Sequence, residues 1–180
     1  MPQAAAHILI PLIIASLFRD FYKKRKNRKK FSLHYILILG IAGIIPDLDV
    51  AVFWILNFFG FSFSSIHRTF AHSIFIPLIF LILALLTTNT KIKELGRHKL
   101  KLNIIFLMVT IGILSHLVLD AIFAGYIIPF YPFSNFSIGL NLFGYLPKTL
   151  EVIAAPSLDA GLLIIYIIYL EWKHKISDFI

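Results

Sequence analysis

Apolar residues occur in long runs along the chain, and short polar segments separate these runs. The pattern predicts apolar helices over about 4–18, 31–59, 72–88, 102–124 and 158–172, the second of them interrupted by Pro46. A membrane-spanning helix needs about 20 apolar residues, so the first run, roughly 22 Å long as a helix, is short for a span. Segment 125–157 is rich in Gly, Pro and aromatic residues and predicts a lid, because long loops in compact domains are usually functional.

The composition indicates that these helices lie in a membrane. Of the 180 residues, 59% are hydrophobic and only 14% are charged, and the mean hydropathy is +0.87. An average soluble domain has about 25% charged residues. These values exclude a disordered chain, a nucleic-acid-binding tail protein and an ordinary cytosolic enzyme. They predict an all-α integral membrane protein, and the length suits a single membrane-embedded helical domain over 1–180. Because the chain has no cysteine, disulfides and thiolate metal sites are excluded.

The net charge of +8 is concentrated in clusters of basic residues within 19–30, 91–101 and 173–175. Short basic loops of membrane proteins stay in the cytoplasm. Two predicted helices lie between each pair of successive clusters, so we expect a multi-pass protein of the cell (inner) membrane with its N-terminus outside and its C-terminus in the cytoplasm. We expect no nucleic-acid partner, because basic runs beside membrane spans serve topology and anionic lipids.

Several ionisable residues interrupt the apolar helices, where such groups are costly and mark functional sites. They are His7, Asp47, Asp49, His67, Arg68, His72, His116, Asp120 and Asp159. In the expected topology, Asp47 lies about 24 Å and His116 about 21 Å from the cytoplasmic ends of their helices. The others lie near the outer ends of theirs. All of these groups are therefore predicted to converge on the outer half of the membrane.

Histidine and carboxylate together favour zinc, with manganese or iron as alternatives, over calcium. His116 and Asp120 are four residues apart and point from one helix face. Eight candidate ligands exceed the needs of one tetrahedral ion, so we expect two or three ions, with some groups orienting the ligands. Each residue alone also has a structural interpretation: a buried histidine in a hydrogen bond, Asp49 or Asp159 as a helix cap, and Arg68 as an interfacial anchor. Burial of four acids and four histidines without a partner would be very unfavourable, which favours a shared metal site.

The ordered motifs resemble a known family. They are Ala6-His7-Ile8-Leu9, Ile45-Pro46-Asp47-Leu48-Asp49, His67-Arg68-Thr69-Phe70-Ala71-His72-Ser73, the run from Gly112 to Asp120, and Pro129-Phe130-Tyr131-Pro132-Phe133-Ser134. This combination is similar to the YdjM/YbcI-type membrane-bound metal-dependent hydrolases, which are distantly similar to the zinc-dependent phospholipase C and single-strand nuclease superfamily. That superfamily is all-helical, holds a zinc cluster with His and Asp, and cleaves phosphoester bonds.

The resemblance implies that His7, Asp47, His67, His72, His116 and Asp120 are metal ligands, with Asp49 and Asp159 as further candidates. The chain departs from the family pattern at Thr69 and Ala71, where Gly and Thr are common, and at Val50-Ala51, where His-Pro is frequent. The departures affect a supporting hydrogen bond and the local backbone, while the types of ligand are kept.

Our leading hypothesis from the sequence is a hydrolase that acts on a lipid-borne phosphoester at the outer membrane interface. Asp47 or Asp49 would serve as general base, and the planar donor fork of Arg68 would hold a phosphate oxygen. The alternatives are a metal transporter or metal-binding sensor, and a structural membrane protein with a degenerate site. Transporters place their sites near the midplane, whereas the inner halves of these helices carry no acid. The metal, the substrate and the oligomeric state are left open.

Overall fold

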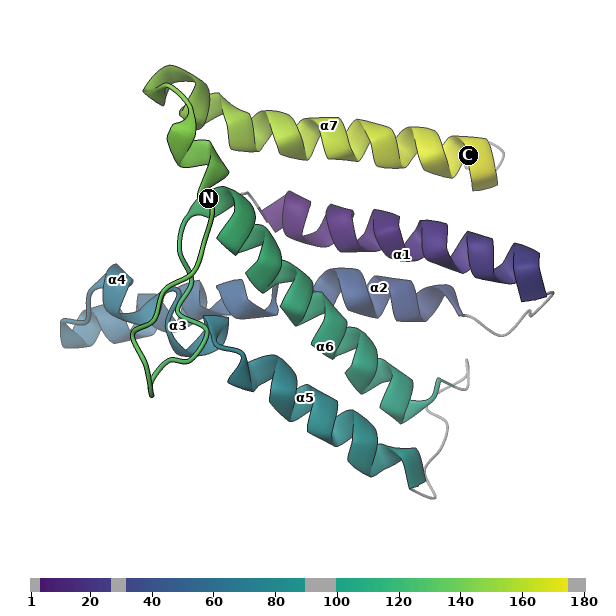
Figure 1. The fold of residues 1–180 in the computed structure, drawn as a ribbon, viewed down its shortest axis with the longest axis horizontal. Helices are drawn as coiled ribbons and strands as arrows, with labels where there is room; N and C mark the ends of the chain where they lie inside the picture. The colour runs from purple at the N-terminus through teal and green to yellow at the C-terminus, as the bar shows by residue number, and fades with distance from the viewer. Residues whose placement is uncertain (1–3, 27–31, 90–99, 175–180) are drawn as a thin grey trace.

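The computed structural model describes residues 4–26, 32–89 and 100–174. These residues form a bundle of helices and contain no β-strand (Figure 1). The first helix, α1, spans Ala4–Lys26 and is longer than the predicted 4–18. It continues because Lys and Arg are good helix formers and extend the apolar helix into a polar region. The Tyr169 hydroxyl donates a 2.8 Å hydrogen bond to Asp20, which fixes this extension to the last helix.

The second predicted helix is broken near Pro46, as expected. Its parts are α2 (Leu33–Ala42), the 3-10 turn η1 (Ile45–Leu48), α3 (Asp49–Leu56) and the 3-10 turn η2 (Asn57–Phe59). The two halves are bent by 47°. The break begins at Gly43, where a Cβ atom would lie 2.2 Å from the His7 carbonyl oxygen. Close backbone contact and the missing amide hydrogen of Pro46 therefore end α2 together.

A compact segment leads from this broken helix into the next hairpin. It contains α4 (Phe63–Ile66) and the 3-10 turn η3 (Phe70–His72). The hairpin consists of α5 (Phe75–Leu86), which continues as η4 (Thr87–Asn89), and α6 (Leu102–Leu119). The helix predicted to begin at His72 thus begins at Phe75, and His72 lies in the preceding turn. The prediction for 102–124 is close, except that Asp120–Ala124 forms one π-helical turn, η5.

The predicted lid is shorter than expected. The last helix, α7, spans Lys148–His174, so it begins ten residues before the predicted 158 and the loop ends at Pro147. Pro156 lies inside α7, as neighbouring groups allow in membrane helices. The loop itself contains the 3-10 turn η6 (Leu142–Tyr145) and a narrow antiparallel pairing of Ile127 with Ile138.

The helices lie roughly along one direction, so the bundle has two distinct ends (Figure 1). The Ala6 amide donates to Asp159, and Tyr169 donates to Asp20, so α1 and α7 are parallel neighbours. α6 packs against both α2 and α5. The helix ends that border the three basic clusters all lie at one end of the bundle. The first turns of α1 and the C-terminal end of α6 lie at the other.

The helices are suited to a membrane. Within the described residues, α1, α6 with η5, and α7 are long and apolar enough to span a bilayer, and the bent pair formed by α2 and α3 is a fourth candidate. The segment Phe75–Asn89 is apolar but shorter. Large apolar side chains such as Phe18, Ile164 and Ile168 are exposed on the helix surfaces, as expected where lipid replaces water. The chain is thus an all-α integral membrane protein.

Candidate metal centre

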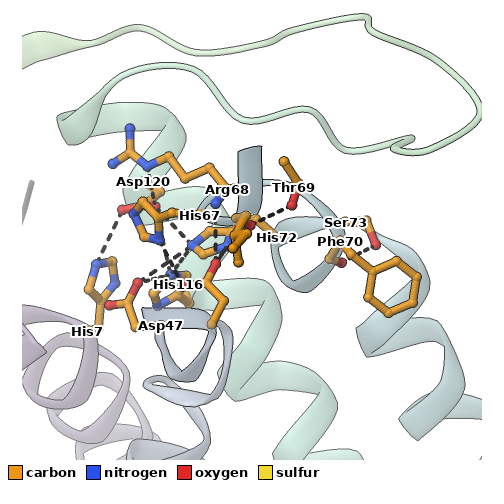
Figure 2. A network of polar contacts seen from close by, with 12 residues as sticks. His7, Asp47, His67, Arg68, Thr69, Phe70, His72, Ser73, His116 and Asp120 are labelled. Atoms are coloured by element: carbon orange, nitrogen blue, oxygen red, sulfur yellow. Dashed lines mark hydrogen bonds and ion pairs between the residues drawn. The ribbon is translucent and has the colours of Figure 1, made fainter. Parts of the chain in front are cut away.

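The structure brings the predicted histidines and acids together from four separate segments of the chain (Figure 2). His7 comes from α1, while Asp47 lies in η1 and Asp49 opens α3. His67 ends α4 and His72 lies in η3, while α6 and η5 contribute His116 and Asp120. His72 and His116 are completely buried, and His7 is almost so, with 1% of its surface exposed.

His116 is held in one orientation by the backbone of the α2 break. Its Nδ1 donates a 2.7 Å hydrogen bond to the Gly43 carbonyl oxygen. Because a carbonyl oxygen only accepts, the proton must be on Nδ1, and Nε2 is left with its lone pair. Nε2 faces the cluster, and the ring stacks on His7 with centroids 3.9 Å apart.

Asp49 orients two further histidines. Its Oδ1 accepts a 2.8 Å hydrogen bond from Nδ1 of His67, and its Oδ2 lies 3.2 Å from Nδ1 of His72. The Arg68 amide donates to the same Oδ2 at 3.3 Å. A carboxylate that binds the remote nitrogen of a histidine is the common support of metal-ligating imidazoles. The structure therefore places Asp49 behind the cluster, and Asp49 belongs to none of the candidate ligand groups among the described residues.

Two carboxylate oxygens, from Asp47 and Asp120, each approach the same pair of imidazole nitrogens at distances that suit ligands of a small cation. Nε2 of His72 lies 3.2 Å from Nε2 of His116, 3.6 Å from Oδ1 of Asp47 and 3.6 Å from Oδ2 of Asp120. Nε2 of His116 lies 3.5 Å from the same Asp47 atom and 3.8 Å from the same Asp120 atom. Metal–ligand bonds of about 2.0–2.1 Å in a tetrahedron separate the ligands by about 3.3–3.4 Å. The residues thus fit zinc without large movement.

His7 and His67 extend the cluster on two sides. Nε2 of His7 lies 3.3 Å from Oδ1 of Asp120, the oxygen not used above. One donor atom each of His7, Asp47 and His116 lie within 4.8 Å of one another, and the same holds for Asp47, His67 and His72. Nδ1 of His7 and Nε2 of His67 are buried without a hydrogen-bond partner among the described residues, and so is Nδ1 of His72, which lies at ion-pair distance from Asp49. These two groups share Asp47 but differ in their histidines, so together they offer enough donor atoms for more than one ion.

The cluster is open mainly at Asp47 and Arg68. The side chain of Asp47 is 27% exposed and that of Arg68 is 19% exposed, compared with 4% for Asp120. Arg68 has a left-handed backbone, with φ of 62°, and its Nε lies 3.4 Å from Oδ2 of Asp120. On the other side of its guanidinium group lies Gly125, at the start of the lid.

The acids make the site attractive to cations. His72 lies between the candidate spans. Burial lowers its pKa, but the nearby carboxylates of Asp47 and Asp49 more than compensate and raise the pKa to about 8. The field at this position therefore favours positive charge, as expected of a cation site.

Two features around the cluster could not be assigned beforehand. Asp159, a candidate ligand, accepts the Ala6 amide hydrogen at 2.9 Å and supports the first turn of α1 beside His7. It belongs to none of the candidate ligand groups among the described residues.

The sequence reasoning missed Gly43, whose carbonyl oxygen orients His116. Only the spacing of Gly43 and Pro46 hints at such a break.

Comparison with known proteins adds one result. Neither the curated proteins nor the solved structures contain a match to this chain. A family model does match, over residues 1–175. The ordered His and Asp motifs and the apolar helices both lie inside this range. The chain therefore belongs to the YdjM inner membrane protein family.

Proposed function

We propose that this protein is a membrane-bound metal-dependent hydrolase that cleaves a phosphoester of a lipid-borne substrate. The observation that carries the proposal is the buried group of His72, His116 and Asp120, which each offer one donor atom within 4.8 Å of the others, with Oδ1 of Asp47 3.6 and 3.5 Å from the same two imidazoles. His7 and His67 would complete a site for further ions. Zinc fits the donor types best, with manganese or iron as alternatives. When bound, such an ion acidifies water and polarises a phosphoryl oxygen.

The protein residues would divide the remaining tasks. Asp47 is the better candidate for general base, because it is the most exposed acid of the cluster. Both oxygens of Asp49 are already engaged by His67, His72 and the Arg68 amide, so Asp49 would orient histidines instead. The guanidinium group of Arg68 would hold a phosphate oxygen at the open side of the cluster. The loop 125–147 would limit access of water.

The proposed orientation places the cluster at the extracytoplasmic interface, with the N-terminus outside and the C-terminus in the cytoplasm. It is supported by the position of the helix ends that border the basic clusters. They lie at the opposite end of the bundle from the first turns of α1, which carry His7, and from the C-terminal end of α6, which carries His116 (Figure 1). A phosphoester headgroup at the outer interface would then reach the cluster from the adjacent leaflet.

Metal content and hydrolysis, measured on the same samples, test the proposal. Detergent-purified wild type should contain zinc, manganese or iron, and it should hydrolyse a phospholipid or a polyprenyl phosphate. His116→Ala should lose both. His34→Ala is the matched control, because His34 lies at the start of α2 and contacts Ser32. Absence of metal from the wild type after reconstitution would contradict the proposal, and metal uptake into sealed vesicles would favour a transporter.

A further inference from the structure

A cavity of about 310 Å³ lies between α1, α2 and α6. Its lining is formed by Pro11, Ile14, Ala15, Phe18, Leu39, Met108, Ile111 and Ser115. We call it the acyl groove. The hydroxyl of Ser115 donates to the Gly112 carbonyl oxygen at 2.7 Å, so the one polar side chain of the lining is already engaged. The volume is at the lower end of the range for ligand sites, about 300–1,000 Å³.

The acyl groove begins near the metal centre, about one helical turn from His7, although no residue of the cluster lines it. Pro11 is one helical turn after His7, and Ser115 directly precedes His116. From there the two walls run side by side, from Pro11 to Phe18 on α1 and from Ser115 back to Met108 on α6. Each wall covers eight residues, so its ends are about 10 Å apart at a rise of 1.5 Å per residue. The groove thus extends from the cluster toward the end of the bundle that bears the basic residues.

The floor of the groove is buried, whereas its rims are exposed, and this difference indicates what occupies it. Leu39 and Met108 at the floor are 5% and 8% exposed, while the rim residues Ile14, Phe18 and Ile111 are 63%, 59% and 40% exposed. Because α1 and α6 are candidate membrane spans, these open apolar rims face hydrocarbon. A chain of a membrane lipid is the occupant available there.

We propose that the acyl groove holds one hydrocarbon chain of the lipid substrate while its phosphoester lies at the metal centre. This inference rests on the proposed function and extends it, because it names a membrane-resident lipid with a chain that descends along α1 and α6. The groove would then select lipid phosphoesters over water-soluble ones.

The first experiment maps where a lipid chain sits. The probe is a phosphatidic acid that carries a photoactivatable diazirine midway along one acyl chain, added to the purified full-length protein. Adducts should concentrate on Ile14, Phe18, Met108 and Ile111. Ala15→Phe and Ile111→Phe fill the groove from opposite walls, and each should lower these adducts about tenfold, as expected when overpacking excludes a ligand. Ile164→Phe is the control, because α7 contributes no residue to the lining.

Adducts spread equally over Ile164 and the groove, and unaffected by both filling variants, would overturn the proposal and indicate ordinary lipid around the protein.

A second experiment separates this inference from the proposed function. In the filling variants, the metal content should stay at the wild-type level, while KM for a long-chain phosphatidic acid should rise and hydrolysis of a water-soluble phosphodiester should not change. An equal effect on both substrates would overturn the groove as a chain site. His116→Ala should keep the groove adducts while it loses metal. If the wild type binds no metal but keeps the groove adducts, the proposed function fails and lipid binding stands.

Discussion

Substitution of Asp49 by Asn tests the division of roles in the cluster. The change keeps the size of the side chain but removes its charge and turns one acceptor oxygen into an amide donor. That donor would face Nδ1 of His67 or Nδ1 of His72, which the carboxylate now holds at 2.8 and 3.2 Å. The imidazole that faces the amide would lose the contact that fixes its tautomer and ring orientation, and the other would keep only an uncharged acceptor.

The expected loss is partial. Removal of a carboxylate that orients metal-ligating histidines costs about 10–100-fold in metal affinity, which corresponds to about 1.4–2.8 kcal/mol. Because Asp49 supports two histidines, we expect a value in the upper half of that range. Loss of a ligand such as His116 should instead remove the metal altogether at the same concentration.

Zinc affinity can be measured by competition with a chelating dye, on protein whose helicity is checked by circular dichroism. Asp20→Asn is the matched control, because Asp20 also accepts a hydrogen bond, from Tyr169, but at the opposite end of α1. Its zinc affinity should equal that of the wild type. Two results would refute the reasoning: an unchanged affinity in Asp49→Asn, or a complete loss equal to that of His116→Ala, which would make Asp49 a ligand.

Three further predictions follow from the same geometry. Arg68→Lys should keep the bound metal but lower kcat/KM for phosphoesters by about tenfold or more, because Lys lacks the planar donor fork; equal kinetics in a steady-state assay would exclude a phosphate contact. Gly125→Ala should lower the melting temperature, since its φ is +132° and a Cβ atom would lie 3.1 Å from Nη1 of Arg68, and such strained positions cost about 1–3 kcal/mol; an unchanged melting curve would contradict this strain. Because the chain has no cysteine, Ser137→Cys in the lid and Thr88→Cys in η4 report topology cleanly. An impermeant maleimide should label only Ser137→Cys in intact cells, and the reverse pattern would invert the proposed orientation.

The apolar helices and most of the cluster could be predicted from the sequence because each rests on a strong local signal. Long apolar runs show where helices lie, and an ionisable residue within them stands out. The helix ends were harder. The beginning of α7 at Lys148 was missed because Pro156 and the Gly-rich segment before it are typical of a loop, whereas the fold tolerates the proline within a helix.

Other parts of the site depend on tertiary contacts that no local pattern encodes. Asp47 and Asp49 are equivalent in the sequence, separated by one residue. The structure distinguishes them because Asp49 contacts the Nδ1 atoms of His67 and His72, while the side chain of Asp47 stays partly exposed. The carbonyl group of Gly43 becomes a partner of His116 only through the approach of α2 to α6, which Gly112 permits: a Cβ atom there would lie 2.5 Å from the Leu39 carbonyl oxygen.

Irregular backbone and candidate ligands coincide in this protein, and one physical constraint accounts for both. Backbone that is not helical is tolerated at membrane depth only where it is buried in protein or lines a cavity. Here the break at Gly43 aims a carbonyl oxygen at His116, and the turns η1, η3 and η5 carry Asp47, His72 and Asp120. A regular helix would direct side chains along one stripe and could not bring these donors to a common point. The interruptions that weaken each helix as a span are therefore what allow the bundle to assemble its polar centre.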